Sequence, residues 1–507
     1  MVHLYQSLLL TIKSGYKAKI VEDSFGNSAS NIGLIYKSIL LGNCFIEKIK
    51  LDSNINSAAD LHGSRFGIML PNSVPTAIVF FALQKLRIAT AIINFTSGQK
   101  NILSSVKSLS YVITSKKFIE ETNMQNISTA INKDCKIIYL EDIKDHIDIV
   151  QKYKALKNFF ESLLFSSKSK YSSDQTAVIL FTSGTESEPK AVGLTHKNLY
   201  TNREQVLKAL KIRKNDKFFT CLPFFHSFGL SIGVLLPILS GCKVFLYPTP
   251  LHFEKIPNLI KNTKSTVFFS TDTFLKKYIP YLNESTFQNV RYRISGAEKV
   301  DEGTHEKYKE FGVQILEGYG VTEASPAISV NTFKNYRLGS VGKFLPGIKY
   351  EIEKIDGCEE GGLLYIRGDN VIKHYLDQSV SESFEMYNTG DIVKIDTDGY
   401  LFILGRLKRF AKIAGEMISL SQVEVFPKKI WPENNSAICS IKDSKKGESL
   451  ILLTDNKNAD LKIVHELMKL EGLSNLYFPK EMKIIDEFPI LGSGKIDFRK
   501  LQEIAES

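Results

Sequence analysis

The sequence contains little of what marks several common classes of protein. Cysteine is rare, at 6 of 507 residues, and no two cysteines form a C-x-x-C pair. This pattern suggests neither a zinc knuckle nor a disulfide framework, so we expect a reducing cytosol. The formal net charge is +10, but no block of like charge resembles a nucleic-acid-binding arm. A lysine-rich solvated surface explains this charge better than a polyanion site, and we expect no nucleic-acid partner.

Long apolar runs are also missing. The most apolar stretch, residues 228–247, is interrupted by two serines, a proline and a lysine, whereas a membrane-spanning helix needs about 18 or more apolar residues. Residues 1–12 are apolar but have no basic region ahead of them, so we expect no signal peptide. The predicted location is cytoplasmic, with peripheral contact to the inner face of the membrane as the most that is expected.

The sequence is rich in short apolar strands that alternate with amphipathic helices. Arg65–Leu70 predicts a strand, Val74–Lys85 has helical periodicity, and Ala89–Asn94 is again strand-like. The same alternation predicts further strands at Thr176–Phe181, Val244–Tyr247, Thr266–Ser270 and Gln314–Leu316. This pattern predicts an α/β fold of layered, mostly parallel sheets and helices.

The turns become tighter between residues 362 and 402, which predicts a small β-rich subdomain. A domain boundary is expected near Arg406, because the remaining hundred or so residues have the size of a small domain. We therefore predict a large N-terminal domain over residues 1–405 and a small α+β C-terminal domain over residues 406–507.

The first motif that carries chemistry is FTSGTESEPKA, residues 181–191, directly after an apolar strand. Its backbone N–H groups and hydroxyls could wrap phosphates, and Lys190 would add positive charge. Pro189 and Ala191 replace the glycine and the Ser/Thr of a Walker-type loop, so a true P-loop is not predicted. An ordinary polar turn is the alternative for this motif taken alone.

Four further motifs follow in the chain. In EGYGVTE, residues 317–323, glycines beside an aromatic ring suit a stacked base, while Thr322 and Glu323 could reach a phosphate and a magnesium ion. In YNTGD, Asp391 could accept both ribose hydroxyls, although an Asp that caps a turn is frequent. The last two motifs are GRLKRFAKIAGE, residues 405–416, and LGSGK, residues 491–495, whose Lys495 could meet a reacting anion or lie plainly on the surface.

In this order, the five motifs resemble the adenylate-forming superfamily of acyl-CoA synthetases, luciferases and peptide-synthetase adenylation domains. The family's phosphate loop usually has the pattern T-S-G-T-T-G-x-P-K-G, from which this chain departs at Glu186, Ser187 and Ala191. The resemblance covers nearly the whole chain. It implies the family's fold, in which the C-terminal domain is mobile and turns about a hinge near Lys408.

Within the superfamily, one branch resembles the chain most. It is the acyl-ACP synthetase half of the bifunctional 2-acylglycerophosphoethanolamine acyltransferase/acyl-ACP synthetase. The runs that carry this resemblance are 67–94, 222–230, 241–251, 295–299 and 409–419. The acyltransferase half needs a His with an Asp five residues later, and none of the nine histidines has one. We therefore expect the synthetase alone, without acyltransferase activity of its own.

The resemblance implies a function for individual residues. The β- and γ-phosphates of ATP are assigned to Thr182, Ser183, Gly184, Thr185 and Lys190. Thr322 is assigned to the α-phosphate, and Glu323 to Mg²⁺. Ribose is assigned to Asp391 and Arg406, and adenine to Gly296, Ala297, Glu298, Gly318, Tyr319 and Gly320. The predicted catalytic set is Lys495, Glu323, Thr182 and His226. His226 would lie at the mouth of an acyl pocket, and a packed core histidine is the alternative.

The thiol-transfer step is assigned to the hinge region. Lys408 occupies the hinge position, and Lys412 and Gly415 would face the site after the C-terminal domain has turned. Four cations lie within seven residues here, and Lys408, Arg409 and Lys412 could dock an acidic acyl carrier protein. A solvated hinge with no partner is the alternative.

These features predict ATP- and Mg²⁺-dependent activation of a fatty acid as its acyl-AMP, followed by thioester formation with acyl carrier protein. Coenzyme A as the acceptor is the nearest alternative. A third option is lysophospholipid acylation with a separate acyltransferase chain. A non-catalytic, lipid-sensing relative is disfavoured because five expected functional positions are intact, namely Lys190, Glu323, Asp391, Arg406 and Lys495.

Overall fold

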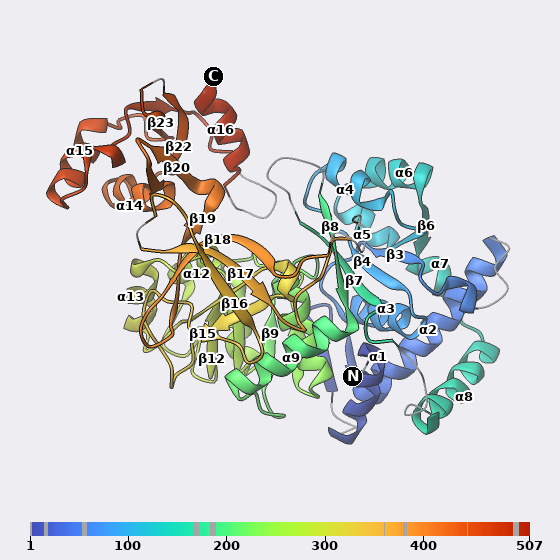
Figure 1. Ribbon diagram of the computed structural model, residues 1–507. Helices are drawn as coiled ribbons and strands as arrows, with labels where there is room; N and C mark the ends of the chain where they lie inside the picture. Colours follow the sequence, from blue (N-terminus) through green and yellow to red (C-terminus); the bar gives the residue numbers. More distant parts are fainter. Residues whose placement is uncertain are drawn as a thin grey trace. The chain divides into compact units, whose positions relative to one another are not determined.

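The computed structural model shows a chain that divides into two compact units (Figure 1). It describes residues 3–14, 19–52, 58–144, 146–165, 172–182, 189–358, 360–376, 378, 383–443, 445–489 and 496–507. Unit 1 is formed by the described residues of 1–184, 188–348 and 368–385, and unit 2 by those of 349–367 and 386–507. The described part of the chain has no helix that is both long and apolar enough to cross a bilayer.

Unit 1 contains two sheets, and most strand pairs in both are parallel. The larger sheet has the order β15-β14-β13-β12-β11-β9-β10-β1-β2. Its strands are β1 (Lys19–Asp23), β2 (Ser28–Ser30), β9 (Lys217–Thr220), β10 (Lys243–Leu246), β11 (Val267–Ser270), β12 (Tyr292–Ser295), β13 (Leu316–Gly320), β14 (Ala327–Val330) and β15 (Lys343–Phe344).

The smaller sheet of unit 1 has the order β6-β5-β3-β4-β7-β8. Its strands are β3 (Arg65–Ile68), β4 (Ala89–Ile92), β5 (Tyr111–Thr114), β6 (Lys136–Tyr139), β7 (Thr176–Thr182) and β8 (Lys190–Thr195). All four residues of β4 and of β5 are buried, as expected for parallel strands that are covered on both faces. The apolar runs of the sequence therefore become the interior strands of this sheet.

Helices cover these sheets (Figure 1). They are α1 (Leu4–Leu10), α2 (Asn31–Asp52), α3 (Val74–Lys85), α4 (Gln99–Val106), α5 (Lys116–Glu121), α6 (Gln125–Asp134), α7 (Leu140–Lys144), α8 (Ile149–Phe165), α9 (His196–Leu210), α10 (Leu236–Leu239), α11 (Lys255–Asn262), α12 (Asp272–Tyr278) and α13 (Glu302–Glu310). Single turns are η1 (Thr11–Ser14), η2 (Ala58–Leu61), η4 (Ile279–Tyr281) and η5 (Thr322–Ala324), and η3 (Phe228–Leu235) is a π-helix.

Local sequence explains where two central helices begin. Ser73 caps α3 by accepting from the backbone N–H of Thr76 at 3.3 Å, and a proline stands in its first turn. Thr195 and Asn198 form a reciprocal capping box at the start of α9. Helix α3 contacts β1 of the larger sheet and β3 and β4 of the smaller one, so it lies between the two sheets. One continuous apolar core therefore joins both sheets of unit 1.

Unit 2 is built from mostly antiparallel sheets. One has the order β16-β17-β18-β19, and the other has the order β21-β20-β23-β22 with β24 parallel to β23. Its strands are β16 (Lys349–Lys354), β17 (Gly362–Arg367), β18 (Tyr387–Ile395), β19 (Leu401–Arg406), β20 (Phe410–Ile413), β21 (Glu416–Ser419), β22 (Ser436–Asp443), β23 (Gly447–Thr454) and β24 (Glu481–Ile484). Its helices are α14 (Leu420–Ile430), α15 (Leu461–Leu470) and α16 (Phe498–Glu506), with single turns η7 (Leu407–Arg409) and η8 (Asn475–Tyr477).

The predicted α/β class is confirmed, and helix α3 has the predicted bounds. One element differs from the prediction. A strand was predicted at 314–316, whereas β13 spans Leu316–Gly320 and contains both glycines of the EGYGVTE motif. The reason is backbone pairing on both sides, with β12 in parallel and β14 in antiparallel register, which overrides the low strand preference of glycine. The domain boundary at residues 405/406 stays a prediction, as does the mobility of the C-terminal domain.

Arg409 is held inside unit 2 and does not extend freely from it. Its guanidinium forms an ion pair with Glu424, donates to the Ile438 carbonyl at 2.9 Å, and lies 3.9 Å from the centroid of the Phe498 ring. Burial raises the pKa of Glu424, and the charge of Arg409 lowers it. Arg409 is therefore not available for the predicted basic docking surface, because its guanidinium is paired with Glu424 inside unit 2.

We predict that Arg409→Leu destabilises unit 2, because it leaves the Glu424 carboxylate buried without its counter-charge. The loss should be about 1.5–3 kcal/mol, the range for hydrogen bonds to charged groups. Chemical denaturation can be followed by the fluorescence of Trp431, the single tryptophan of the chain and a residue of unit 2.

The matched control is Lys429→Leu, which removes one partner of the exposed Lys429–Glu471 pair and should change stability by less than about 1 kcal/mol. The double variant Arg409→Leu/Glu424→Leu should recover part of the loss, since it leaves no unpaired charge. An Arg409→Leu variant as stable as the wild type would contradict a structural role for this ion pair.

Candidate functional site

The centre of the candidate site is the turn that joins β13 to β14. Strand β13 ends at Gly320, and η5 then carries Thr322 and Glu323. A Cβ atom on Gly320 would lie 2.1 Å from the carbonyl oxygen of Pro326, so only glycine allows this close approach of two backbone segments. The predicted phosphate and metal residues thus stand on a tight turn at the carboxyl end of a central strand, a common place for ligands in α/β sheets.

Glu323 is buried, with 8% of its surface exposed. The Tyr375 hydroxyl donates to its Oε1 at 2.9 Å, and the Glu323 backbone carbonyl accepts from the N–H of Ile372 at 2.9 Å. A single buried carboxylate fits Mg²⁺, which is often bound by one or two carboxylates together with waters and substrate phosphates. The described residues include no cluster of three or more His, Cys, Asp or Glu that could form a closed protein cage.

Tyr375 also contacts the predicted phosphate lysine. The Nζ of Lys190 lies over the Tyr375 ring, 5.0 Å from its centroid. One tyrosine therefore joins two predicted site residues, with its ring beneath the cation and its hydroxyl on the carboxylate. Sequence reasoning missed Tyr375, because 52 residues separate it from Glu323 and no local pattern pairs them.

Tyr375 is placed by the segment 368–376, which belongs to unit 1 although β17 before it and β18 after it belong to unit 2. This segment is bonded to the η5 turn at several points. The Asn370 amide donates to the Ala324 carbonyl at 2.8 Å, and the Ser325 hydroxyl donates to the Asn370 carbonyl at 2.9 Å. The backbone N–H of Leu376 donates to the Ala191 carbonyl in β8 at 3.2 Å. The segment 368–376 is thus hydrogen-bonded both to the η5 turn and to β8, the strand that begins at Lys190.

His226 and Thr322 are brought close by Ser227. The hydroxyl oxygens of Ser227 and Thr322 lie 3.3 Å apart. The side chain of His226 is exposed, and its ring packs edge-on against Phe225 with centroids 4.8 Å apart. His226 is therefore not a buried core histidine. It directly precedes Ser227, which contacts Thr322 of η5. The acyl pocket predicted at His226 stays a prediction.

The residues predicted to frame adenine lie at the ends of neighbouring strands. Ser295 pairs with Glu317, which sets Gly296 beside Gly318, and a Cβ on Gly296 would lie 3.5 Å from the Gly318 carbonyl. Ala297 has a left-handed backbone, with φ +66°. The Glu298 carboxylate accepts from the N–H of Thr273 at 2.9 Å, in the first turn of α12. Gly296, Gly318 and Tyr319 thus lie close together at the carboxyl ends of β12 and β13. The Glu298 carboxylate is engaged in its hydrogen bond to α12.

The predicted phosphate loop is described only at its two ends. Thr182 ends β7 and pairs with Lys190, which begins β8. Ser183, Gly184 and Thr185 lie outside the described residues, and so does Lys495. Their assignments stay predictions from the sequence.

In unit 2, the predicted ribose residues are direct neighbours across two strands. Asp391 of β18 pairs in register with Arg406 of β19, and the Arg406 Nε lies 3.1 Å from the Asp391 Oδ1. The Asp391 side chain is buried, whereas 65% of the Arg406 side chain is exposed. The backbone N–H of Asp391 donates to the Thr389 hydroxyl at 3.1 Å. An anchored carboxylate beside an exposed guanidinium can accept from hydroxyl groups, as the ribose assignment requires.

The hinge residues occupy a turn and a hairpin of unit 2. Lys408 lies in η7, and the exposed Lys412 lies in β20, which pairs with β21. Gly415, at the turn between these strands, has φ +93°. A Cβ there would meet no atom within 4 Å, so the backbone conformation alone explains the glycine.

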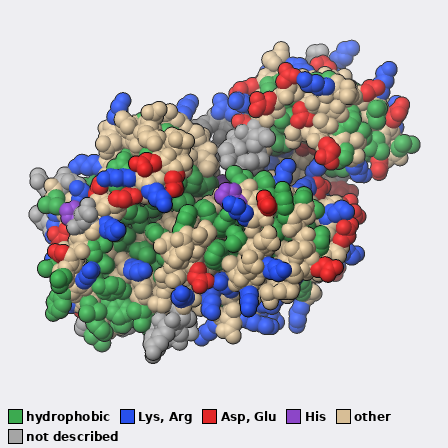
Figure 2. All heavy atoms as spheres, turned by 180° about the vertical axis from the view of Figure 1, so that it is seen from behind, with side chains coloured by type: hydrophobic (Ala, Val, Ile, Leu, Met, Phe, Trp, Pro, Cys, Tyr) green, Lys and Arg blue, Asp and Glu red, His purple; other side chains and the backbone are tan. Residues whose placement is uncertain are grey.

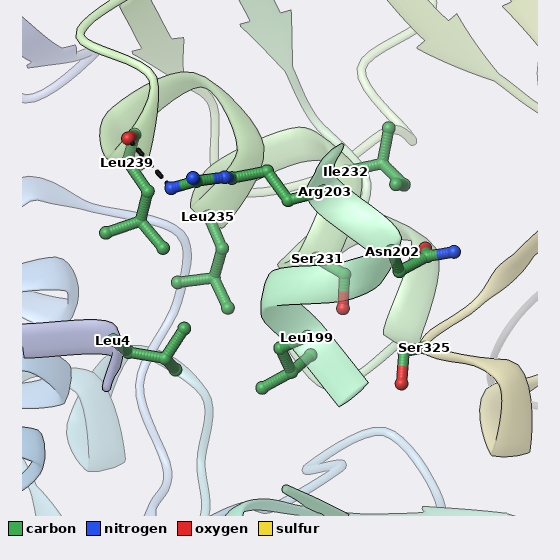
Figure 3. A pocket seen from close by; sticks show the side chains of 9 residues that line it. All are labelled: Leu4, Leu199, Asn202, Arg203, Ser231, Ile232, Leu235, Leu239 and Ser325. Carbon is green, nitrogen blue, oxygen red and sulfur yellow. Dashed lines mark hydrogen bonds between the residues drawn. The ribbon is translucent and has the colours of Figure 1, made fainter. Parts of the chain in front are cut away.

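A small cavity is lined in part by Ser325, the residue that follows η5 (Figure 3). Its volume is about 10 Å³. It is lined by Leu4, Leu199, Asn202, Arg203, Ser231, Ile232, Leu235, Leu239 and Ser325. The Arg203 Nη1 donates to the Leu239 carbonyl at 3.0 Å, while the buried Ser231 hydroxyl has no hydrogen-bond partner in the described part of the chain. The cavity can hold about one water molecule and not an acyl chain.

Comparison with known proteins gives consistent matches. A sequence model of the family described as AMP-binding enzyme matches residues 61–376, more than half of the chain. An oxalate–CoA ligase from Arabidopsis thaliana is 27% identical over 474 residues, which cover 88% of this chain and 89% of that protein. A long-chain-fatty-acid–CoA ligase from Yersinia pestis is 25% identical over 490 residues, covering 87% and 85%.

The fold is found in solved structures. The o-succinylbenzoate CoA synthetase MenE from Bacillus subtilis, in complex with ATP and magnesium ion, superposes with a TM-score of 0.82 at 19% identity and covers 98% of this chain and 99% of that chain. The predicted fold is confirmed. The chain belongs to the AMP-binding enzyme family, within the adenylate-forming superfamily.

Proposed function

We propose that this chain activates a long-chain fatty acid as its acyl-AMP and passes the acyl group to a thiol, so that it acts as an acid–thiol ligase. The observation that carries the proposal is the arrangement Lys190–Tyr375–Glu323, which places a cation and a buried carboxylate on one tyrosine within an AMP-binding enzyme. The fatty acyl substrate is supported by the similarity to the Yersinia pestis ligase and by the resemblance to acyl-ACP synthetases.

The first half-reaction requires positive charge and donors at the phosphates. A carboxylate oxygen of the acid attacks the α-phosphorus of ATP, the bond to the β-phosphate oxygen breaks, and pyrophosphate leaves. Negative charge accumulates on the α-phosphoryl oxygens, where fixed cations and donors stabilise it. Lys190 and Thr182 are proposed for the β- and γ-phosphates, Thr322 for the α-phosphate, and Glu323 for a Mg²⁺ ion that offsets phosphate charge. Ribose is proposed for Asp391 and Arg406, and the bridge between the carboxylate and the α-phosphate for Lys495.

In the second half-reaction, a thiolate attacks the acyl carbonyl, the carbon–sulfur bond forms, and AMP leaves. The thiol of an acyl carrier protein is proposed on the resemblance of five sequence runs. Coenzyme A is at least as well supported, because the relatives reported above are CoA ligases. Arg409 is engaged inside unit 2, so a carrier-docking surface at the hinge would depend on Lys408 and Lys412. A separate lysophospholipid acyltransferase could then use the carrier thioester, and the cytoplasmic location stays part of this proposal.

The proposed function can be tested with the two half-reactions kept apart. Pyrophosphate release from ATP should require Mg²⁺ and an added acid, with palmitate preferred over oxalate and o-succinylbenzoate. Acyl carrier protein and coenzyme A, added separately, should then reveal the acceptor as a thioester by mass spectrometry. Suppose that fatty acids do not stimulate pyrophosphate release and another carboxylic acid does. The proposal of a fatty acyl substrate would then be wrong, whereas the family assignment would stand.

We predict that Tyr375→Phe raises the Mg²⁺ concentration needed for half-maximal acyl-AMP formation by about tenfold or more. The substitution removes the hydrogen bond that holds the Glu323 carboxylate, worth about 1.5–3 kcal/mol for a charged acceptor, while the ring beneath Lys190 remains. Tyr375→Leu should in addition raise the KM for ATP, because it removes the aromatic face that positions Lys190.

Tyr281→Phe is the matched control, since Tyr281 lies exposed in η4 and the same single oxygen is lost. A purely structural role for Tyr375 would lower the amount of active enzyme without moving the Mg²⁺ titration midpoint. An unmoved midpoint in Tyr375→Phe would therefore count against its part in positioning Glu323.

A further inference from the structure

Helix α8 exposes an apolar face to solvent. It spans Ile149–Phe165 and is about 25 Å long. Seven of its large apolar side chains each expose between 37% and 83% of their surface. They are Ile149, Val150, Tyr153, Leu156, Phe160, Leu163 and Leu164. Exposed hydrophobic residues are normally scattered singly, so seven on one helix require an explanation.

These seven residues form one continuous stripe. Successive residues of a helix turn by about 100°, and the spacings of three, four and seven residues place all seven on the same side. The opposite side carries Gln151, Ala155 and Phe159, which are buried. That side packs on α2, where the Asn158 amide donates to the Asn43 amide oxygen at 3.2 Å and the Tyr36 hydroxyl donates to the Lys152 carbonyl at 3.4 Å. The helix is therefore amphipathic with its apolar stripe directed outward.

The figures show the same arrangement. In Figure 1, α8 lies at the periphery of unit 1 with α2 beside it. In Figure 2, which views the molecule from behind, hydrophobic side chains gather at the lower left, the region where α8 is found. The stripe is thus at an outer edge of unit 1, where a flat surface could meet it.

Three lysines border the stripe. At about 100° per residue, Lys152 falls at one edge, and Lys154 and Lys157 fall at the other. All three are exposed. Glu161 is the one acidic residue between 149 and 165, so the helix itself carries a net charge of +2. The Lys154 Nζ lies 3.8 Å from the Glu47 carboxylate of α2, so Lys152 and Lys157 are the border lysines that have no ion pair with another described residue. An apolar stripe bordered by lysines on both sides fits a surface that is apolar within and anionic at its boundary.

A second copy of this chain fits the stripe less well. In a two-fold symmetric contact, the same patch lies on both sides, so the lysine borders would face each other. Like charges at an interface oppose association, and one glutamate per helix does not offset three lysines. A bilayer with anionic headgroups instead offers acyl chains to the stripe and negative charge to the lysines.

We propose that α8 docks this protein on the surface of an anionic lipid bilayer, with its apolar stripe inserted to the boundary between headgroups and acyl chains. The purpose of this docking rests on the proposed function, because long-chain fatty acids partition into bilayers and an enzyme on that surface meets its substrate there. The docking itself is a property of α8 and is measured without nucleotide or acid.

The test is co-sedimentation of the full chain with vesicles. One set consists of phosphatidylcholine alone, and the other contains one part phosphatidylglycerol to two parts phosphatidylcholine. The wild type should bind the anionic vesicles and release from them as salt is raised, because screening weakens the lysine contribution. Tyr153→Ser/Leu164→Ser should bind about tenfold more weakly, since two apolar side chains no longer insert. Lys152→Gln/Lys157→Gln should lose about as much affinity and most of the salt dependence.

The matched control is Tyr281→Ser/Leu470→Ser, which removes the same two residue types from exposed positions, at 44% and 85% exposure, outside α8. Its vesicle binding should equal that of the wild type. Pyrophosphate release with soluble octanoate in vesicle-free buffer should be the same in all variants, which shows that each variant is folded.

Two results would overturn the proposal. One is equal vesicle binding by the wild type, the α8 variants and the control. The other is an α8 variant that changes the molar mass measured by light scattering while vesicle binding stays as in the wild type, which would make α8 an interface between two copies. If octanoate and palmitate both fail to support pyrophosphate release in the wild type, the proposed function fails, and the vesicle result still decides the docking.

Discussion

The hydrogen bond from the Tyr375 hydroxyl to the Glu323 carboxylate is the constraint on which the candidate site depends. A single turn such as η5 has too few internal hydrogen bonds to hold a charged side chain in one position. The segment 368–376 supplies what the turn lacks, by bonding to its backbone through Ile372 and Asn370 and to its carboxylate through Tyr375. Buried polar groups must be paired, so the turn and the segment hold one another in place. The carboxylate is thereby fixed before any ligand is bound, as electrostatic preorganisation requires.

The same tyrosine keeps two opposite charges near each other without letting them neutralise each other. Among the described residues, no ion pair joins Lys190 to Glu323. The cation lies over the ring face, which is electron-rich, and the carboxylate accepts from the hydroxyl at the ring's edge. A direct ion pair would satisfy both groups and leave little charge for a bound nucleotide. With Tyr375 between them, the ammonium group can still meet phosphate oxygens and the carboxylate can still meet a cation.

Arg409 illustrates the opposite use of charge. Four cations within seven residues suggested a basic surface. One of them, Arg409, instead forms an ion pair with Glu424 and lies over the Phe498 ring within unit 2. Charge density along a sequence does not reveal which side chains face solvent, because alternate residues of a strand or turn point to opposite sides. Arg406 stays largely exposed beside Asp391, and Lys408 and Lys412 are exposed as well.

The parts of the fold that follow from local rules could be predicted from the sequence. Helix α3 has the predicted bounds because Ser73 and the following proline specify its start, and the buried strands appear in the sequence as short, mostly apolar runs. Strand β13 could not be located correctly, because its pairing with β12 and β14 is a long-range property that no local pattern encodes. Tyr375 was missed for the same reason. Asp391 and Arg406 were each assigned to ribose by resemblance, and that they lie side by side in the register of β18 with β19 could not be predicted from the sequence.

Helix α8 shows why an apolar pattern alone does not identify the core. Its periodicity predicts an amphipathic helix, and the usual expectation is that the apolar side packs inward. Here the buried side consists of Gln151, Ala155 and Phe159, and two hydrogen bonds join it to α2, between Asn158 and Asn43 and between the Tyr36 hydroxyl and the Lys152 carbonyl. Leaving seven large apolar side chains in water costs free energy in proportion to their area, roughly 25 cal/mol per Å². The polar contacts with α2 are few and weakly stabilising, so a helix with this rotation gains most where a second apolar medium covers its outer side.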